Sequence, residues 1–131
     1  MDDLFSALAA SSSGMEAQSR RLRFVSENIA NADTPGYRRK LAVFETVVQG
    51  GGRDGVQVRT GPVRLDRSEL ASIYDPGHPL ADETGRYQGS NVDLVIEIAD
   101  AREAQRSYEA NLKMFDQARQ MTRSLFELLR R

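Results

Sequence analysis

Residues 28–40 read NIANADTPGYRRK, and this stretch decides how the rest of the chain is organised. Asn31 and Asp33 tolerate non-helical backbone and can bond their own main chain, while Thr34 precedes a proline and is therefore pushed out of the α region. Pro35-Gly36 fits the two central positions of a type II turn. The stretch predicts a helix that stops and a tight turn that leads into a strand.

Upstream of this stop, apolar residues recur every seven positions. The repeating residues are Leu8, Met15, Leu22 and Ile29, with Leu4, Val25 and Ala32 at neighbouring positions of the same face. This heptad pattern predicts an amphipathic helix that packs against another helix. Its weak point is the run SSSG at residues 11–14, because serine and glycine have low helix propensity.

Downstream, the chain has neither glycine nor proline from Ser90 onward. Ser90-Asn91-Val92-Asp93 has the form of a capping box, which predicts a helix start. Positions that are mostly apolar or small then recur at steps of three and four: Leu94, Ile98, Ala101, Gln105, Tyr108, Leu112, Phe115, Ala118, Met121, Leu125 and Leu128. A helix of about 40 residues would be roughly 60 Å long, so the N-terminal helix can cover only part of it.

The middle of the chain changes character. Short strands are predicted at residues 41–48, 56–59 and 63–66, with a further one at 70–74. The glycine-rich residues 50–55 (GGGRDG) predict a hairpin loop, and Thr60-Gly61-Pro62 predicts a turn.

These observations predict a mainly α fold with a small antiparallel β insert. We assign residues 1–35 to an N-terminal helix, 36–89 to the β-rich insert and 90–131 to a long C-terminal helix. The two helices would form an elongated coiled-coil pair that flanks the insert.

Composition narrows the possible functions. The chain has 18 Lys and Arg against 19 Asp and Glu, so no basic field exists to hold nucleic acid. It has no cysteine, which removes disulfides and thiolate zinc sites. No stretch approaches the roughly 20 apolar residues of a membrane span. The start of the sequence is acidic and its apolar run is short, so we expect no cleaved signal peptide.

The sequence offers little for catalysis. His78 is the only histidine and lies between a glycine and a proline, which favours a turn over a catalytic base. Asp75, Asp82 and Glu83 form at most a weak oxygen-rich cation site, without the spacing of an EF-hand or a zinc motif. Gly50 begins a triple glycine that lacks the lysine of a phosphate-binding loop. We therefore expect no enzyme, no cofactor and no metal.

The helix stop is coupled to a matching helix at the other terminus, and here the sequence resembles a known family. Residues 28–37 (NIANADTPGY) look like the N-terminal signature of flagellar rod and hook axial proteins, and residues 13–18 (SGMEAQ) are similar too. Further stretches narrow the resemblance to the proximal rod proteins of the FlgC family. They are residues 37–45 (YRRKLAVFE), 74–82 (YDPGHPLAD), 91–93 (NVD) and 106–111 (RSYEAN).

The resemblance implies a structural subunit of the bacterial flagellar proximal rod, which polymerises helically in the periplasm as part of the torque-transmitting drive shaft for motility. It implies copies of the chain and the rod proteins FlgB, FlgF, FlgG and FliE as partners. It also implies export by the flagellar type III apparatus without cleavage. The alternative is a cytosolic helical-hairpin adaptor or export chaperone that uses the same apolar helix faces but needs neither a β insert nor secretion.

Two groups of residues are predicted to carry this function. The partner interface would consist of Leu8, Met15, Leu22, Val25, Ile29, Ile98, Tyr108, Leu112, Phe115, Met121, Leu125 and Leu128. The corner between helix and insert would consist of Asn28, Asn31, Thr34, Pro35, Gly36 and Tyr37. Charged residues of the two helices are expected to pair by sign, within or between subunits: Asp93, Glu97 and Asp100 with Arg20, Arg21 and Arg23.

Overall fold

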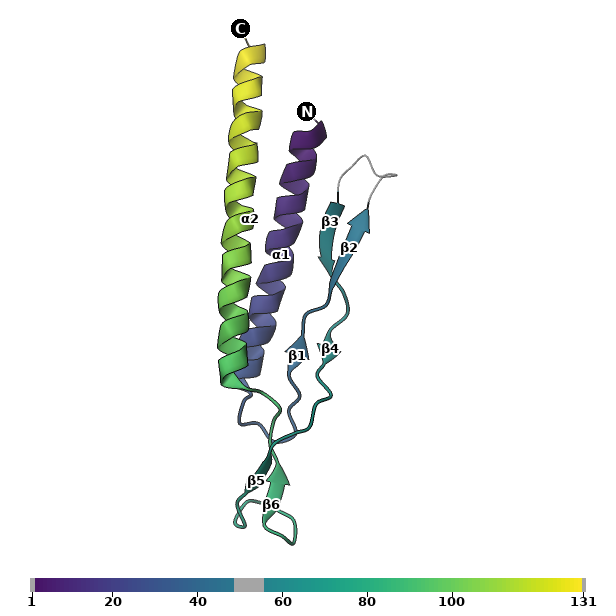
Figure 1. Ribbon diagram of the computed structural model, residues 1–131, viewed down its shortest axis with the longest axis vertical. Coiled ribbons are helices and arrows are strands. Elements are labelled where there is room, and N and C mark those ends of the chain that lie inside the picture. The colour runs from purple at the N-terminus through teal and green to yellow at the C-terminus, as the bar shows by residue number, and fades with distance from the viewer. Residues whose placement is uncertain (1, 49–55, 131) are drawn as a thin grey trace.

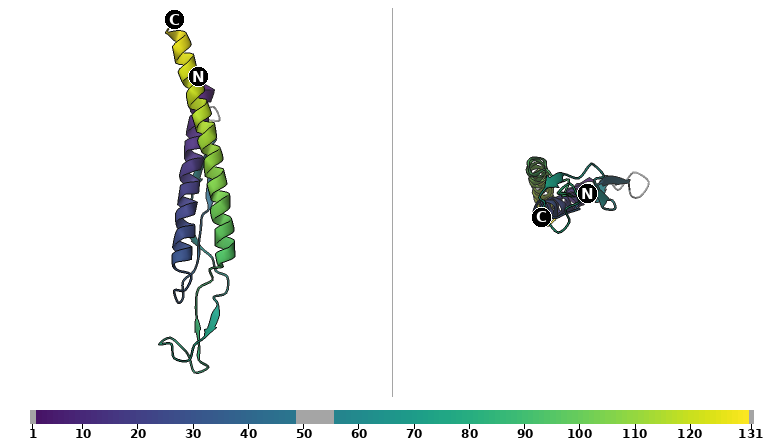
Figure 2. Two further views of the ribbon diagram at one scale, coloured as in Figure 1. Left: turned by 90° about the vertical axis from the view of Figure 1, so that its left-hand side faces the viewer. Right: turned by 90° about the horizontal axis from the view of Figure 1, so that it is seen from below.

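Two antiparallel helices form the body of the molecule (Figure 1). The structure is a computed structural model that describes residues 2–48 and 56–130. Helix α1 spans Asp2–Ala30 and helix α2 spans Leu94–Leu129. The N- and C-termini lie at the same end, where the longer α2 extends past the start of α1 (Figures 1 and 2).

Six short strands form three separate two-stranded antiparallel sheets. Strand β1 (Lys40–Leu41) pairs with β4 (Arg64–Leu65), and β5 (Ser72–Tyr74) pairs with β6 (Arg86–Gln88). Strand β2 (Phe44–Val48) pairs with β3 (Val56–Thr60), with Thr46 opposite Val58. Two-stranded sheets are marginal by themselves, so their support must come from the helices or from other chains.

The three sheets follow one another along the molecule (Figure 1). The β2–β3 hairpin lies beside α1, and the β1–β4 pair lies between this hairpin and the end of the helices. The β5–β6 hairpin forms the end opposite the termini, beyond the last turn of α1 and the first turn of α2 (Figures 1 and 2). The molecule is therefore a helical pair with a β extension, which confirms the expected fold class.

The β insert differs from the prediction in two places. A single strand over 41–48 is wrong: the chain leaves β1 after Leu41 and starts β2 at Phe44, and between them the Val43 carbonyl accepts a hydrogen bond from Gly61 N at 2.7 Å. The strand Arg86–Gln88 was not predicted, because it is short and bounded by glycines. The predicted loop at residues 50–55 lies outside the described residues.

The helix ends differ as well. Helix α1 stops at Ala30, before the expected boundary at residue 35. The predicted capping box at Ser90 is wrong, because the N-cap of α2 is Asp93, whose side chain accepts a hydrogen bond from Val95 N at 3.0 Å. The Ser90 hydroxyl instead donates to the Ala32 carbonyl and so ties the exit of α1 to the entry of α2.

The core is small and partly polar. The buried apolar residues are Ala17, Phe24, Val25, Ala104 and Ala118, and the buried polar residues are Ser11, Asn28, Ser90 and Glu97. Many larger apolar side chains are exposed instead, which matters for the interfaces described below. Within the described residues, no helix is both long and apolar enough to cross a membrane.

Candidate assembly interface

Helices α1 and α2 meet through small and polar residues. On α1 these are Gly14, Arg21 and Asn28, and on α2 they are Glu97, Ala104, Asn111 and Ala118, in each case seven residues apart. The backbone at Gly14 approaches so closely that a Cβ there would lie 2.8 Å from the Asn111 side chain. We name these seven residues the inner stripe. Its heptad period is that of a coiled coil, but its residues are not the apolar ones that sequence reasoning selected.

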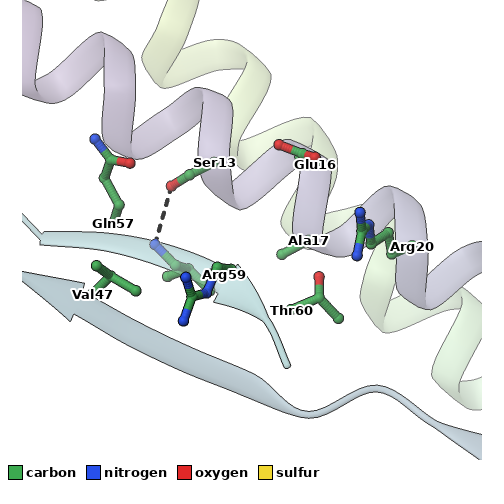
Figure 3. Close-up of a pocket in the computed structure, with 9 residues that line it drawn as sticks. Ser13, Glu16, Ala17, Arg20, Val47, Gln57, Arg59 and Thr60 are labelled. Atoms are coloured by element: carbon green, nitrogen blue, oxygen red, sulfur yellow. Dashed lines mark hydrogen bonds between the residues drawn. The ribbon is translucent and has the colours of Figure 1, made fainter. Parts of the chain in front are cut away.

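The inner stripe explains the serine-rich run at residues 11–14. Ser11 is buried, and Gly14 permits the close approach to α2. On another side of α1, Ser13 Oγ accepts a hydrogen bond from Val58 N of strand β3 at 3.1 Å (Figure 3). A cavity of about 330 Å³ lies beside this bond. It is lined by residues of α1, among them Glu16 and Arg20, and by residues of the β2–β3 hairpin. The serine-rich run therefore has low helix propensity at the place where α1 contacts both α2 and strand β3.

Most of the apolar residues predicted as a partner interface are exposed. Seven of them are exposed: Ile29, Ile98, Tyr108, Leu112, Met121, Leu125 and Leu128. Leu8, Met15, Leu22 and Phe115 are half-buried. Val25 differs, because it is only 4% exposed and belongs to the core of the chain itself. We name the seven exposed members the apolar flanks; their contact with partners stays a prediction.

Asn28 organises the corner where helix becomes β insert. Its side-chain oxygen accepts hydrogen bonds from Tyr37 Oη and Lys40 N, both at 2.8 Å. Its side-chain nitrogen donates to the Lys40 carbonyl at 3.0 Å and to Glu97 Oε2 at 3.2 Å. All four hydrogen-bonding positions of this buried amide are therefore used, which fixes β1 against both helices. Burial also raises the pKa of the Tyr37 phenol.

The turn after α1 has the predicted form. Tyr37 N donates to the Thr34 carbonyl at 3.2 Å, and Gly36 has φ of +73°, as the third position of a type II turn requires. Asn31 closes the helix end, since its side chain donates to the Glu27 carbonyl at 2.8 Å and accepts from Thr34 Oγ1 at 3.1 Å. The corner residues are thus brought together as expected.

An ion-pair network that sequence reasoning missed lies directly behind this corner. Arg39 Nε donates to Glu97 Oε1 at 2.7 Å, and the same guanidinium lies 3.3 Å from Asp66 and 3.5 Å from Asp100. Glu97 is fully buried. Burial opposes the charge of Arg39, but its bonds to Glu97 and Asp66 outweigh this and leave its pKa raised. The only sequence signal was the position of Arg39 in the basic cluster after the turn.

Asn91 performs a similar task at the entry to α2. Its side-chain oxygen accepts from Arg39 N at 2.7 Å, and its side-chain nitrogen donates to the Asp66 carbonyl at 2.9 Å. Its backbone N–H donates to the Tyr37 carbonyl at 3.3 Å. Two asparagines therefore tie the insert to the helical pair: Asn28 near the end of α1, and Asn91 just before the start of α2.

The predicted pairing of helix charges is confirmed at one arginine. Arg21 contacts Asp100 at 2.8 Å and Glu103 at 3.3 Å across the helix contact. Glu97 pairs with Arg39 rather than with an arginine of α1, and Asp93 caps its own helix. Within the chain, α1 presents Asn28 rather than an arginine at the level of Glu97, and pairing between subunits stays a prediction.

His78 does not resemble a catalytic base. Its ring stacks on Tyr87 at 3.9 Å, and its Nδ1 accepts from Leu80 N at 3.1 Å. The Asp82 carboxylate is used within its own turn by Thr84 and Arg86, and these hydrogen bonds, with that of the Thr84 hydroxyl largest, lower its pKa. In residues 2–48 and 56–130, no group of three or more acidic or histidine side chains could hold a metal ion.

Comparisons with known proteins agree with this architecture. Residues 8–38 match the family described as "Flagella basal body rod protein", and residues 83–128 match "Flagellar basal body rod FlgEFG protein C-terminal". The flagellar basal-body rod protein FlgC of Agrobacterium fabrum is 45% identical over 99% of this chain and 98% of its own length. The chain belongs to the FlgC family of flagellar basal-body rod proteins. FlgC of Aquifex aeolicus is 39% identical over 97% of this chain and 95% of its own length.

A third FlgC protein is similar over nearly its whole length. FlgC of Borreliella burgdorferi is 32% identical over 96% of this chain and 97% of its own length. The two family matches cover α1 with its corner, and α2 with the strand before it. As a FlgC-family member the chain is a structural subunit of the flagellar proximal rod, and the comparisons do not favour the adaptor or chaperone alternative.

Proposed function

We propose that this chain polymerises in the periplasm with copies of itself and with FlgB, FlgF, FlgG and FliE, and that it contacts them through the apolar flanks of α1 and α2. The observation that carries the proposal is that each helix has two sets of residues, the inner stripe and the apolar flanks. The inner stripe holds the chain together, while Ile98, Met121 and Leu128 remain about half exposed or more. Exposed apolar surface of this extent marks a site of association.

The geometry suits a shaft that transmits torque. The two helices lie along the long axis of the molecule (Figure 2). Contacts along such helices can involve several neighbours, and heterologous contacts do not close pairwise but continue into a filament. The corner around Asn28 would hold the β extension at a fixed angle to the helices, so that strain applied to one is passed to the other.

Deletion of the gene in its native host tests the proposed function. We expect cells that do not swim and whose basal bodies, seen by electron microscopy, have rings but no complete rod. The full-length gene supplied in trans should restore both. Complete rods and normal swimming in the deletion strain would contradict the proposal and would reopen the adaptor alternative.

Export without cleavage is the second part of the proposal. Helix α1 begins at Asp2, and Leu4 lies near α2 residues such as Met121 and Leu125. Cleavage would remove N-terminal residues that pack against α2, so we expect these residues to be kept. Mass spectrometry of the protein from purified basal bodies should find the N-terminal residues intact. A mature protein shortened by 15 or more residues would contradict this part of the proposal alone.

A further inference from the structure

The loop at the far end of the molecule has a shape fixed by its own contacts. We name residues 75–85, between β5 and β6, the tip loop. One oxygen of Asp82 accepts three hydrogen bonds, from Thr84 N, Thr84 Oγ1 and Arg86 N, at 2.9, 2.6 and 3.1 Å. Gly85 has φ of +80°, and a Cβ there would lie 3.0 Å from Tyr74 and Pro76. The tip loop is therefore preorganised without help from the helices.

This fixed loop presents apolar side chains to solvent. Leu80, within the loop, is 63% exposed, and Tyr74, which precedes it, is 64% exposed. Two acidic residues of the loop, Asp75 and Glu83, are exposed as well. Arg86 lies over the Tyr74 ring at 5.6 Å and is thus occupied by an aromatic contact. The tip loop is an apolar knob with an acidic rim.

A groove of the opposite character lies on α2. It has a volume of about 560 Å³ and is lined by Val95, Ile98, Ala99, Arg102, Glu103 and Arg106. Helical periodicity places Val95, Arg102 and Arg106 on the side of α2 away from Glu97 and Ala104, which face α1. We name it the outer groove.

The outer groove is lined by apolar residues and by two arginines, which we call its rim. Val95 is 76% exposed and Ile98 is 48% exposed. Glu103, the only acid that lines the groove, lies 3.3 Å from Arg21 of α1. Because Glu103 is paired, Arg102 and Arg106 make the rim positively charged. The groove is therefore complementary to the knob in both polarity and charge.

We propose that the tip loop of one copy docks into the outer groove of a second copy. Within one chain the tip loop points away from α2 (Figures 1 and 2), so the contact must join two chains. Leu80 and Tyr74 would lie on Val95 and Ile98, with the acidic rim beside the arginines. Knob and groove are different surfaces, so the contact is heterologous and continues from copy to copy. The inference rests on the proposed function, because it names one contact of that assembly.

Cysteine cross-linking tests the contact directly, since the natural chain has no cysteine. Two differently tagged copies, one Leu80→Cys and one Ile98→Cys, are expressed together in the deletion strain and oxidised. We expect a disulfide-linked pair carrying both tags, at least about tenfold above a control in which Gln120→Cys replaces Ile98→Cys. Tyr74→Cys with Val95→Cys provides a second pair if one of the first variants fails to restore swimming.

A charge exchange tests the rim. Glu83→Arg and Arg106→Glu should each lower the cross-linking yield several-fold, and the two together should recover most of it. A yield equal to that of the Gln120→Cys control would overturn the inference. A link to a different rod protein in place of the tagged copy would also overturn it, because the occupant would not be a second copy.

These outcomes are separable from a failure of the proposed function. If the deletion strain lacks rods but no cross-link forms in cells complemented with the cysteine variants, only the tip contact is wrong. If the deletion strain builds complete rods and swims, the proposed function itself is wrong, whatever the cross-linking shows.

Discussion

The inner stripe and the apolar flanks lie on the same two helices but are made of different residues. The inner stripe buries Asn28, Glu97 and Ala104, whereas the flanks leave Ile98 and Leu112 exposed. A chain that folded only for its own stability would bury the apolar residues between its helices. Under the proposed function, the chain would reserve this apolar area for partners and use small and polar residues to set the helix register.

The largest expected effect comes from breaking the inner stripe at its buried charge. Glu97→Ala leaves the guanidinium of Arg39 without its shortest contact and the Asn28 side-chain nitrogen without one of its two acceptors. Removal of one partner of a buried pair costs about 3–5 kcal/mol in the free energy of unfolding, which urea denaturation would measure. Glu103→Ala removes a carboxylate that is 70% exposed and should cost less than about 1 kcal/mol. Equal effects of the two substitutions would contradict this account of the stripe.

A smaller effect is expected from overpacking the stripe. Gly14→Leu places a large side chain where Asn111 lies within 3 Å of a Cβ, and should lower the free energy of unfolding by about 2 kcal/mol. Asn111→Ala in the same chain should recover part of the loss by making space. Thermal unfolding followed by circular dichroism would show both changes. An unchanged midpoint for Gly14→Leu alone would mean that the helices do not approach closely at this level.

The corner allows a sharper test of backbone conformation. Gly36→Ala adds a Cβ with no atom within 4 Å, so its cost comes from the positive φ alone and should be about 1 kcal/mol. Gly77→Ala is a matched control, because this glycine lacks a positive φ and its Cβ would meet only an ordinary contact at 3.7 Å. Loss of stability in the control but not in Gly36→Ala would refute the type II turn as the determinant of the corner.

The smallest effect is a dependence on pH. Hydrogen bonds from Ser68, together with Arg39, lower the pKa of Asp66, and Lys40 lowers that of Glu27. Both groups therefore add stability above their unfolded pKa values near 4, and this stability is lost as the pH falls through the folded pKa values. Urea midpoints should drop between pH 5 and pH 3. Asp66→Asn should show a shallower drop, and a drop of the wild-type slope would exclude Asp66 as a contributor.

Much of the fold could be predicted because its signals are local. The Thr34-Pro35-Gly36 turn depends on the backbone preferences of three adjacent residues, and the long helices follow from periodicity and the absence of helix breakers. The inner stripe could not be found this way. Sequence patterns identify a helix contact by its apolar residues, and here the contact is made by Gly14, Asn28 and Glu97.

The network behind the corner was missed for a related reason. Arg39 and Asp66 are 27 residues apart, and Arg39 and Glu97 are 58 apart, so only the folded chain brings them together. The strand pair of β5 and β6 was predicted only in part, because three-residue strands leave little periodicity to detect. The partner interface was predicted from the apolar heptad pattern. The same pattern was expected to mark the contact between the two helices, where the inner stripe lies instead.

The most direct test of the central claim compares folding and assembly in one variant. Ile98→Glu with Leu112→Glu places two negative charges on the apolar flank of α2, and Ala110→Glu places one on an exposed position elsewhere on that helix. We expect the double variant to keep its unfolding free energy within about 0.5 kcal/mol of wild type and yet to leave cells without complete rods. Ala110→Glu should preserve both. A double variant that builds rods and swims, or one that no longer folds, would contradict the division between inner stripe and apolar flanks.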